Sequence, residues 1–167
     1  DLGHATYLDA FDRQDDPNPL YAAATETLLR IQLASREAEL PEYDHALLAR
    51  ELGLFPDWYI TRQLRRELSP ADRQVLETTF ESLLANNLAQ PRVFVHRDYH
   101  CRNLMVCASL PGVLDFQDAV YGPITYDLVS LFRDAYVRWE EAQVLDWLVR
   151  YWEKARRAGL PVRADFA

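Results

Sequence analysis

Three side chains with oxygen atoms suited to metal binding lie close together in the sequence: Asp98, Asn103 and Asp115. Carboxylate and amide oxygens are among the ligands that Mg²⁺ takes in proteins. A further carboxylate beside such a cation could orient and deprotonate a hydroxyl group, which is most of what phosphoryl transfer requires of a protein. The residue types therefore indicate Mg²⁺-dependent phosphoryl transfer to a hydroxyl, with Asp98 facing that hydroxyl.

A short β element must position these residues. The run Val93-Phe94-Val95 is β-branched and aromatic, and it predicts a buried strand just ahead of the first carboxylate. Two further apolar runs, residues 104–106 and 112–114, flank a turn and predict a small hairpin. Because a hairpin brings the residues at its open ends together, we expect Asn103 and Asp115 to face one cation.

Helices are predicted for most of the remaining chain. Asn18 is expected to cap a helix with Pro19 at its first position, and Ser69 to cap another with Pro70 at its first position. A long helix is predicted over residues 140–158, ended by a glycine. Apolar residues at helical spacing predict a core face after Ser69. They are Leu76, Phe80, Leu83 and Leu84. The fold class is therefore α+β and mainly α.

Charge and cysteine content narrow the class of protein. The chain has 18 Lys and Arg against 26 Asp and Glu, a net charge of −8 at pH 7. Such a chain binds nucleic acid poorly, because neutralising phosphates requires clustered cations. Cys101 and Cys107 are too few for a disulfide framework and fit a reducing compartment. No apolar run could span a bilayer and no signal peptide is recognised, so we expect a cytoplasmic protein without membrane association.

The spacing around Asp98 also matches a known catalytic-loop pattern. His96-Arg97-Asp98 and Asn103 fit the kinase signature H-R-D-x-x-x-x-N, and Asp115-Phe116-Gln117 stands where protein kinases have D-F-G. The missing glycine points away from protein kinases and towards small-molecule kinases of the same fold. A third motif follows, because Gly122-Pro123 precedes Asp127. Together these motifs resemble those of the aminoglycoside phosphotransferase and choline kinase superfamily.

Flanking residues narrow this resemblance. Residues 95–100 and 112–119 are similar to the bacterial kinases that phosphorylate N-acetylmuramate and N-acetylglucosamine at the anomeric hydroxyl in cell-wall recycling. The similarity runs over residues 1–167. It implies that the chain is the C-terminal lobe of a kinase-like fold, whose short hairpin carries the catalytic and metal residues. It also implies ATP as co-substrate, Mg²⁺ as cofactor, and an N-terminal nucleotide lobe elsewhere in the full-length protein.

The resemblance assigns roles to individual residues. Asp98 resembles the catalytic base, and Asn103 and Asp115 resemble the Mg²⁺ ligands. Asp127 resembles the buried aspartate that fixes the catalytic loop, and His96 resembles the structural histidine of that loop. The remaining candidates are His100, Arg102, Gln117 and Asp118, near the substrate or the metal, and Asp1 and Leu2, at the backbone that holds adenine.

Three alternatives stay open. The acceptor could be an aminoglycoside or another small alcohol, an option that the acidic balance slightly favours. The chain by itself could be an inactive lobe that only binds substrate or Mg²⁺. Finally, His96 and His100 flank a carboxylate at a spacing that forms a zinc pair on a helix. The preceding strand and the lack of an evident third ligand argue against that zinc site.

Overall fold

The computed structural model describes residues 2–166, which divide into two compact units. One unit consists of the chain up to Pro41 together with the chain from Pro91 onward, and the other is Glu42–Gln90. The predicted site residues all belong to the first unit. Its elements, in chain order, are α1 (Tyr7–Asp12), α2 (Pro17–Leu33), β1 (Arg92–Val95), β2 (Leu104–Met105), β3 (Gly112–Val113), a 3₁₀ turn (Phe116–Asp118), β4 (Val120–Pro123), α5 (Tyr126–Phe132) and α6 (Glu141–Arg157).

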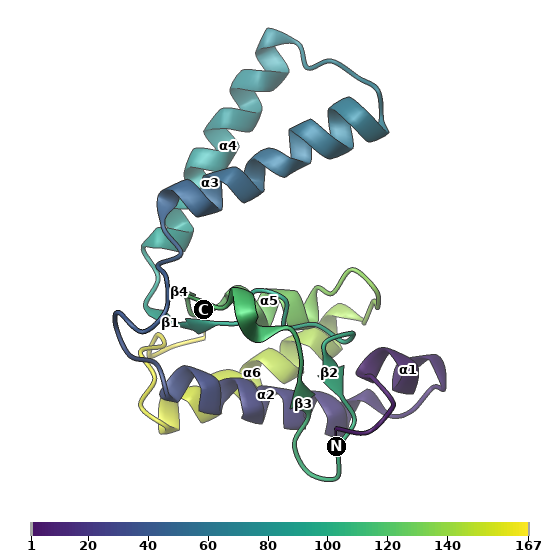
Figure 1. Cartoon of the computed structure of the whole chain (residues 1–167). Coiled ribbons are helices and arrows are strands. Elements are labelled where there is room, and N and C mark those ends of the chain that lie inside the picture. Colours follow the sequence, from purple (N-terminus) through teal and green to yellow (C-terminus); the bar gives the residue numbers. More distant parts are fainter. Residues whose placement is uncertain (1, 167) are drawn as a thin grey trace. The chain divides into compact units, whose positions relative to one another are not determined.

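Two antiparallel strand pairs frame the predicted site (Figure 1). In one of them, β2 and β3 pair with Leu104 opposite Val113 and Met105 opposite Gly112, which confirms the predicted hairpin. In the other, β1 pairs with β4. The strand β1 was predicted, whereas β4 was not. Its sequence, Val120-Tyr121-Gly122-Pro123, contains turn residues that mask a short strand.

The core of the first unit forms where α2 and α6 run side by side (Figure 1). The buried residues of α6 recur at helical spacing: Val144, Trp147, Tyr151 and Ala155. Trp147 meets Tyr21 of α2 with ring centroids 4.4 Å apart. Burying a large apolar side chain stabilises a fold by about 1.5–3 kcal/mol. The packing of α2 against α6 therefore contributes to the stability of the unit that carries the predicted site. The predicted end of α6 is confirmed, because Gly159 follows it with φ +84°.

A buried polar chain links this helix pair to the segment that leads into α5. The hydroxyl of Tyr151 donates to Gln32 Oε1, and Gln32 Nε2 donates to the carbonyl of Ile124 at 3.0 Å. Gln32 is 2% exposed. Buried polar groups must find partners, so this chain fixes α2, α6 and Ile124 relative to one another.

The predicted helix starts are partly right. Ser69 caps α4 (Pro70–Leu88) by accepting a hydrogen bond from the Asp72 amide at 3.2 Å, as predicted. The prediction for Asn18 is wrong, because Asp16 caps α2 and Pro17 occupies its first position. Asn18 instead donates its amide to Asp16 Oδ1 at 3.0 Å. The dipeptides Asp-Pro and Asn-Pro give equal start signals here, and the helix begins at the earlier one.

The second unit contains α3 (His45–Leu54), a π-helical segment (Phe55–Gln63) and α4, with α3 packed on α4. The predicted core face of α4 is only partly correct. Leu84 is buried, Leu76 and Phe80 are half-buried, and Leu83 is 43% exposed. A unit of so few helices cannot enclose a wide apolar face. Within the described residues, no helix combines the length and apolar character needed to cross a bilayer.

Candidate functional site

A buried carboxylate holds the backbone of the loop that follows β1. Asp127, in the first turn of α5, accepts hydrogen bonds from the amides of His96 at 2.7 Å and Arg97 at 3.0 Å. Its side chain is fully buried. Burial raises the pKa of Asp127 to about 7, the two amide donors lower it, and the negative charge of Asp98 raises it further. Asp127 therefore supports the backbone of the loop at His96 and Arg97.

Further hydrogen bonds fold the loop around Asp98. The Asp98 carbonyl accepts from the His100 amide at 3.0 Å and from Asn103 Nδ2 at 3.0 Å. The Asn103 amide in turn donates to the His100 carbonyl at 2.9 Å. The Asp98 carboxylate remains exposed. The loop backbone is thus held by hydrogen bonds within the loop, while the Asp98 side chain stays exposed to solvent.

His96 links the loop to the hairpin. Its Nε2 donates to the Leu114 carbonyl at 2.9 Å, and the Leu114 amide donates to the Asn103 carbonyl at 2.9 Å. Burial lowers the pKa of His96, although the charges of Asp98 and Asp115 act to raise it. The ring is therefore neutral near pH 7. Because both carboxylates act on this ring, it marks the point where the loop and the end of the hairpin converge.

Asp115 and Asn103 can supply oxygen ligands for a cation. Asn103 pairs with Leu114 at the open end of the hairpin, so it lies one residue from Asp115 across the strands. The amide nitrogen of Asn103 is engaged by the Asp98 carbonyl, which leaves Oδ1 as an acceptor. Gln117 Nε2 donates to Asp115 Oδ1 at 2.8 Å, and Oδ2 has no hydrogen bond within the described part of the chain. This donor set fits Mg²⁺, which prefers oxygen ligands and keeps several waters.

Asp115 has an unusual backbone conformation. Its φ of 66° and ψ of 39° lie in the left-handed region, which a non-glycine residue adopts at a cost of about 1 kcal/mol or more. The conformation turns the chain from β3 into the 3₁₀ turn that carries Gln117 and Asp118. Such strain persists where the surroundings impose it, and it is common at functional sites. Arg97 of the loop shares this conformation with φ 77°, and so do Gln14, Ala38 and Arg65 outside the loop and hairpin.

The other candidate residues lie around this centre in different ways. Arg97 Nη1 donates to the Asp118 carbonyl at 3.4 Å, which ties the loop to the 3₁₀ turn. The His100 ring packs edge-on against Tyr136, with centroids 5.5 Å apart. Arg102 lies over the same Tyr136 ring, 5.0 Å from its centroid. Tyr136 was missed from the sequence, because it lies between α5 and α6 in no recognisable motif.

The start of the chain packs on the hairpin. Leu2 lies against Gly112, where an added Cβ would come within 2.8 Å of a Leu2 methyl carbon. The Leu2 carbonyl also accepts a hydrogen bond from the Cys107 thiol at 3.4 Å. Asp1, the other residue expected at the adenine-binding backbone, lies outside the described residues.

The geometry around His96 and His100 differs from that of a zinc pair. The segment 96–100 is not helical, so the two imidazoles do not share a helix face. Within residues 2–166, no group of three or more His, Cys, Asp or Glu side chains is placed to hold a metal ion. A structural or catalytic zinc site needs at least three protein ligands of these kinds. The described residues therefore give the zinc alternative no support.

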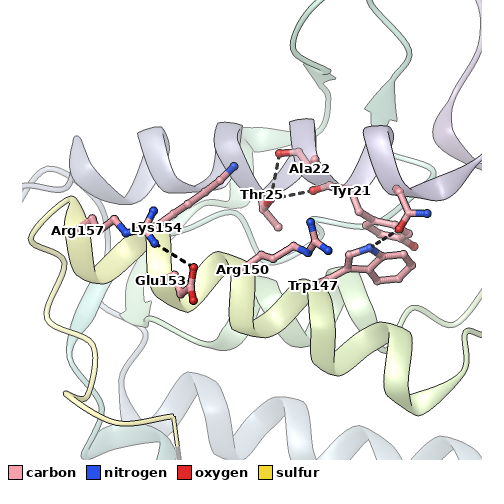
Figure 2. A pocket seen from close by; sticks show the side chains of 9 residues that line it. Tyr21, Ala22, Thr25, Trp147, Arg150, Glu153, Lys154 and Arg157 are labelled. Atoms are coloured by element: carbon pink, nitrogen blue, oxygen red, sulfur yellow. Dashed lines mark hydrogen bonds and ion pairs between the residues drawn. The ribbon is translucent and has the colours of Figure 1, made fainter.

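A separate hollow of about 500 Å³ lies between α2 and α6 (Figure 2). Its basic side chains are each matched by a nearby acid: Arg150 by Asp146 at 2.7 Å, Lys154 by Glu26 at 3.5 Å, and Arg157 by Glu153 at 3.1 Å. None of the predicted site residues lines this hollow. The site that the sequence predicts is thus the loop and hairpin around Asp98, and not the hollow in Figure 2.

Comparisons with known proteins identify the family of the chain. The model of the phosphotransferase enzyme family matches residues 1–165. An N-acetylmuramate/N-acetylglucosamine kinase of Neisseria meningitidis is 52% identical over 99% of this chain and 51% of its own length. The protein of that name from Pseudomonas putida is 49% identical over 99% of this chain and 49% of its own length. The chain therefore spans about half the length of these curated relatives.

Solved structures show the fold. An aminoglycoside phosphotransferase APH(2″)-IIa in complex with gentamicin matches 95% of this chain and 56% of its own, with a TM-score of 0.61 and 18% identity. The ADP-bound APH(2″)-Ib matches 95% of this chain and 57% of its own, with a TM-score of 0.60 and 18% identity. The fold is thus kinase-like, helix-rich α+β with few short strands. Because the family model covers nearly all of its residues, the chain belongs to the phosphotransferase enzyme family.

Proposed function

We propose that the full-length protein is an ATP-dependent kinase that phosphorylates the anomeric hydroxyl of N-acetylmuramate and N-acetylglucosamine. The observation that carries this proposal is the identity of about half of all residues, over 99% of this chain, with relatives of that name. The loop and hairpin around Asp98 supply the residue types that the reaction requires. In the cell, the product would be an amino-sugar 1-phosphate formed in cell-wall recycling.

The proposed mechanism gives each residue of the site one task. The exposed carboxylate of Asp98 accepts the proton of the sugar hydroxyl and aims its oxygen at the γ-phosphate. Asn103 Oδ1 and Asp115 would hold Mg²⁺, which neutralises charge on the phosphate oxygens when bound. Gln117 orients the Asp115 carboxylate, and Asp127 fixes the loop backbone.

His96 completes the support of the site, because its ring joins the loop to the hairpin end through the Leu114 carbonyl. His100 and Arg102 both contact the Tyr136 ring, and the substrate would lie on this side of the loop. The Asp118 side chain, exposed in the 3₁₀ turn, is a further candidate contact for substrate or metal-bound water. From the family resemblance, we also propose that the backbone at Asp1 and Leu2 belongs to the segment that holds adenine.

We also propose which functions the two parts of the full-length chain have. Residues 1–167 would be the C-terminal, catalytic lobe, and an N-terminal lobe would contribute the nucleotide-covering loop and its lysine. The relatives are about twice as long as this chain, which leaves room for such a lobe. We also propose a cytoplasmic location, because ATP is the co-substrate and because Cys101 and Cys107 are both free thiols.

An aminoglycoside kinase is the second candidate function. The likeness to the gentamicin complex of APH(2″)-IIa favours it, and the exposed acids of the site would attract a cationic acceptor. However, that likeness rests on 18% identity, against 52% and 49% for the amino-sugar kinases. We therefore prefer the amino-sugar acceptor. The chain alone, without an N-terminal lobe, would be an inactive module that binds substrate or Mg²⁺.

A substrate panel tests the proposed function. The full-length protein is incubated with ATP, Mg²⁺ and, in turn, N-acetylmuramate, N-acetylglucosamine and gentamicin, and the phosphorylated products are identified by NMR. We expect both amino sugars to be phosphorylated at C1 and gentamicin to remain unmodified. Modification of gentamicin alone would overturn the amino-sugar proposal in favour of the second candidate. Reactions without Mg²⁺ serve as the control and should yield no product.

A further inference from the structure

Arg102 stands in the catalytic loop without an acidic partner. Its guanidinium donates to the Tyr136 hydroxyl at 3.3 Å and lies over the Tyr136 ring, but no carboxylate within residues 2–166 pairs with it. Several other arginines of this unit have an acidic partner: Arg133 binds Glu141 at 2.6 Å and Arg150 binds Asp146 at 2.7 Å. The Arg102 side chain is exposed, so its remaining donors are open to a ligand.

Tyr136 is a fixed platform beside the loop. The Asp134 carboxylate accepts hydrogen bonds from the amides of Tyr136 and Cys101, both at 2.9 Å, and so ties the platform to the loop. The His100 ring packs against the Tyr136 ring from the loop side. A guanidinium that already rests on an aromatic face loses less freedom when it binds a ligand. Arg102 is therefore held in advance, next to Asn103 and on the same loop as Asp98.

The two proposed acceptors differ at one place on the sugar ring. N-acetylmuramate carries a lactyl ether at C3 that ends in a carboxylate, and N-acetylglucosamine has a hydroxyl there. A planar guanidinium is the side chain best suited to bind a carboxylate through two parallel hydrogen bonds. In a chain of net charge −8, such a substrate needs a local cation. The other cation of the loop, Arg97, already contacts the Asp118 carbonyl.

Resting on the proposed function, we propose that Arg102, supported by Tyr136, binds the lactyl carboxylate of N-acetylmuramate and thereby sets the preference for this sugar over N-acetylglucosamine. Arg102 follows Asp98 by four residues in the same loop, so a sugar whose anomeric hydroxyl is at Asp98 would place its C3 substituent near this loop. Tyr136 also borders a hollow of about 310 Å³ formed by residues 132–139, which gives the C3 substituent room. Arg102 acts on substrate choice and takes no part in proton transfer.

Exchange of Arg102 tests this proposal in the full-length enzyme. The kcat/KM values for both sugars are measured for the wild type and for Arg102→Gln, Arg102→Lys and the control Arg30→Gln. Arg30 is an exposed arginine of α2 that belongs neither to the loop nor to the hollow beside Tyr136. We expect Arg102→Gln to lower kcat/KM for N-acetylmuramate about 10-fold to 100-fold, mainly through KM, which matches the loss of a charge-assisted hydrogen bond. N-acetylglucosamine turnover should change less than about 3-fold.

The variants have distinct expected outcomes. The kcat/KM of Arg102→Lys for N-acetylmuramate should lie between the values of the wild type and Arg102→Gln. An ammonium keeps the positive charge but cannot form the two parallel hydrogen bonds of a guanidinium. Arg30→Gln should leave the ratio of the two sugars unchanged. In the wild type, the neutral methyl ester of N-acetylmuramate should have a lower kcat/KM than the free acid. This comparison uses no substituted protein, so a folding defect cannot explain its result.

The outcomes also separate this proposal from the function on which it rests. If the wild type phosphorylates both sugars, and Arg102→Gln lowers both values equally or neither, the role of Arg102 is overturned and the kinase function stands. The same holds if the methyl ester reacts as well as the free acid. If the wild type phosphorylates neither sugar, the proposed function itself fails.

Discussion

At the scale of residues, the chemistry proposed for the site depends on one exposed carboxylate, in a loop whose backbone is held by several hydrogen bonds. The backbone around Asp98 is held by Asp127, by His100 and by Asn103, and none of these contacts uses the Asp98 side chain. A group that is positioned without being engaged can accept a proton from a substrate without first breaking a bond within the protein. This arrangement separates the support of the loop from its proposed reaction.

The first prediction concerns Asp98 itself. In the full-length enzyme, we expect Asp98→Asn to lower kcat by roughly 10²-fold to 10⁴-fold, the range of general-base catalysis, while KM changes little. Thermal stability should stay unchanged, because the side chain is exposed. Steady-state kinetics and melting curves measure both effects. Asp12→Asn, at the exposed end of α1, is the matched control. A kcat close to that of the wild type would remove Asp98 from its proposed role.

The second prediction is a pH dependence of stability that arises from Asp127. Its pKa is about 7 in the folded chain and about 3.8 when unfolded, so the folded state keeps a proton that the unfolded state releases between these values. The free energy of unfolding therefore falls as pH rises from about 4 to about 7, by at most about 4 kcal/mol. His96 acts in the opposite sense. Because burial lowers its pKa, its contribution is lost as pH falls below about 6.5.

Replacement of Asp127 by Asn separates the two effects. Asp127→Asn removes the titrating group and leaves one of the two loop amides without its acceptor, so the variant should be less stable than the wild type. The stability difference between wild type and variant should shrink as pH rises from 4 to 7. Urea unfolding across this pH range measures it. Parallel pH profiles for the two proteins would show that Asp127 does not titrate in this range.

At the scale of elements, the site is held in place by the packing of α2 and α6. Gln32 of α2 links Tyr151 of α6 to the Ile124 carbonyl, three residues before Asp127. We predict that Gln32→Ala lowers the free energy of unfolding by about 2–4 kcal/mol, because it leaves buried polar groups unsatisfied and opens a cavity. Urea unfolding of the full-length protein measures this loss. The exposed Gln74→Ala on α4 should have almost no effect.

A double variant checks the origin of that loss. In Gln32→Ala/Tyr151→Phe, the hydroxyl that Gln32 satisfied is gone, so the combined destabilisation should be smaller than the sum of the single effects. Full additivity would mean that the hydrogen bond between Gln32 and Tyr151 contributes nothing to the stability of the fold.

The elements also show how far the sequence alone predicts this structure. Local signals were sufficient where the residues favour a single local structure. Ser69 caps its helix, and Val93–Val95 lies in the strand β1. They failed where tertiary pairing decides. The strand β4 exists because β1 offers it a partner. At the start of α2, two local signals compete, and Asp16 rather than Asn18 caps the helix. Leu83 has helical spacing but too few neighbours to bury it.

The candidate site followed the same division. Asp98, Asn103 and Asp115 stand out in the sequence because phosphoryl transfer restricts both residue types and spacing, and the hairpin does bring Asn103 close to Asp115. Tyr136 and Asp134 could not be predicted. They reach the loop only because the segment between α5 and α6 folds back on it, and nothing in their spacing indicates that contact.

At the scale of the whole molecule, the chain spans about half the length of the curated relatives that it matches. Its relatives are roughly twice as long, and ADP is bound in a solved structure with this fold, of which this chain covers 57%. Phosphoryl transfer needs the nucleotide and the acceptor to be held in line, and most of its rate enhancement comes from that positioning. The loop and hairpin described above supply only the residues proposed for the acceptor and the metal.

The last prediction therefore compares the 167-residue chain with the full-length protein. We expect the shorter chain to fold, because the unit that contains α2 and α6 has its own core, but to produce ADP from ATP and N-acetylglucosamine at least roughly 10³-fold more slowly. Circular dichroism checks the folding, and a coupled ADP assay measures the rate. Full-length Asp98→Asn sets the background of the assay. Turnover by the short chain within tenfold of the full-length rate would mean that these residues position the nucleotide unaided, and that the proposed N-terminal lobe is dispensable for the transfer.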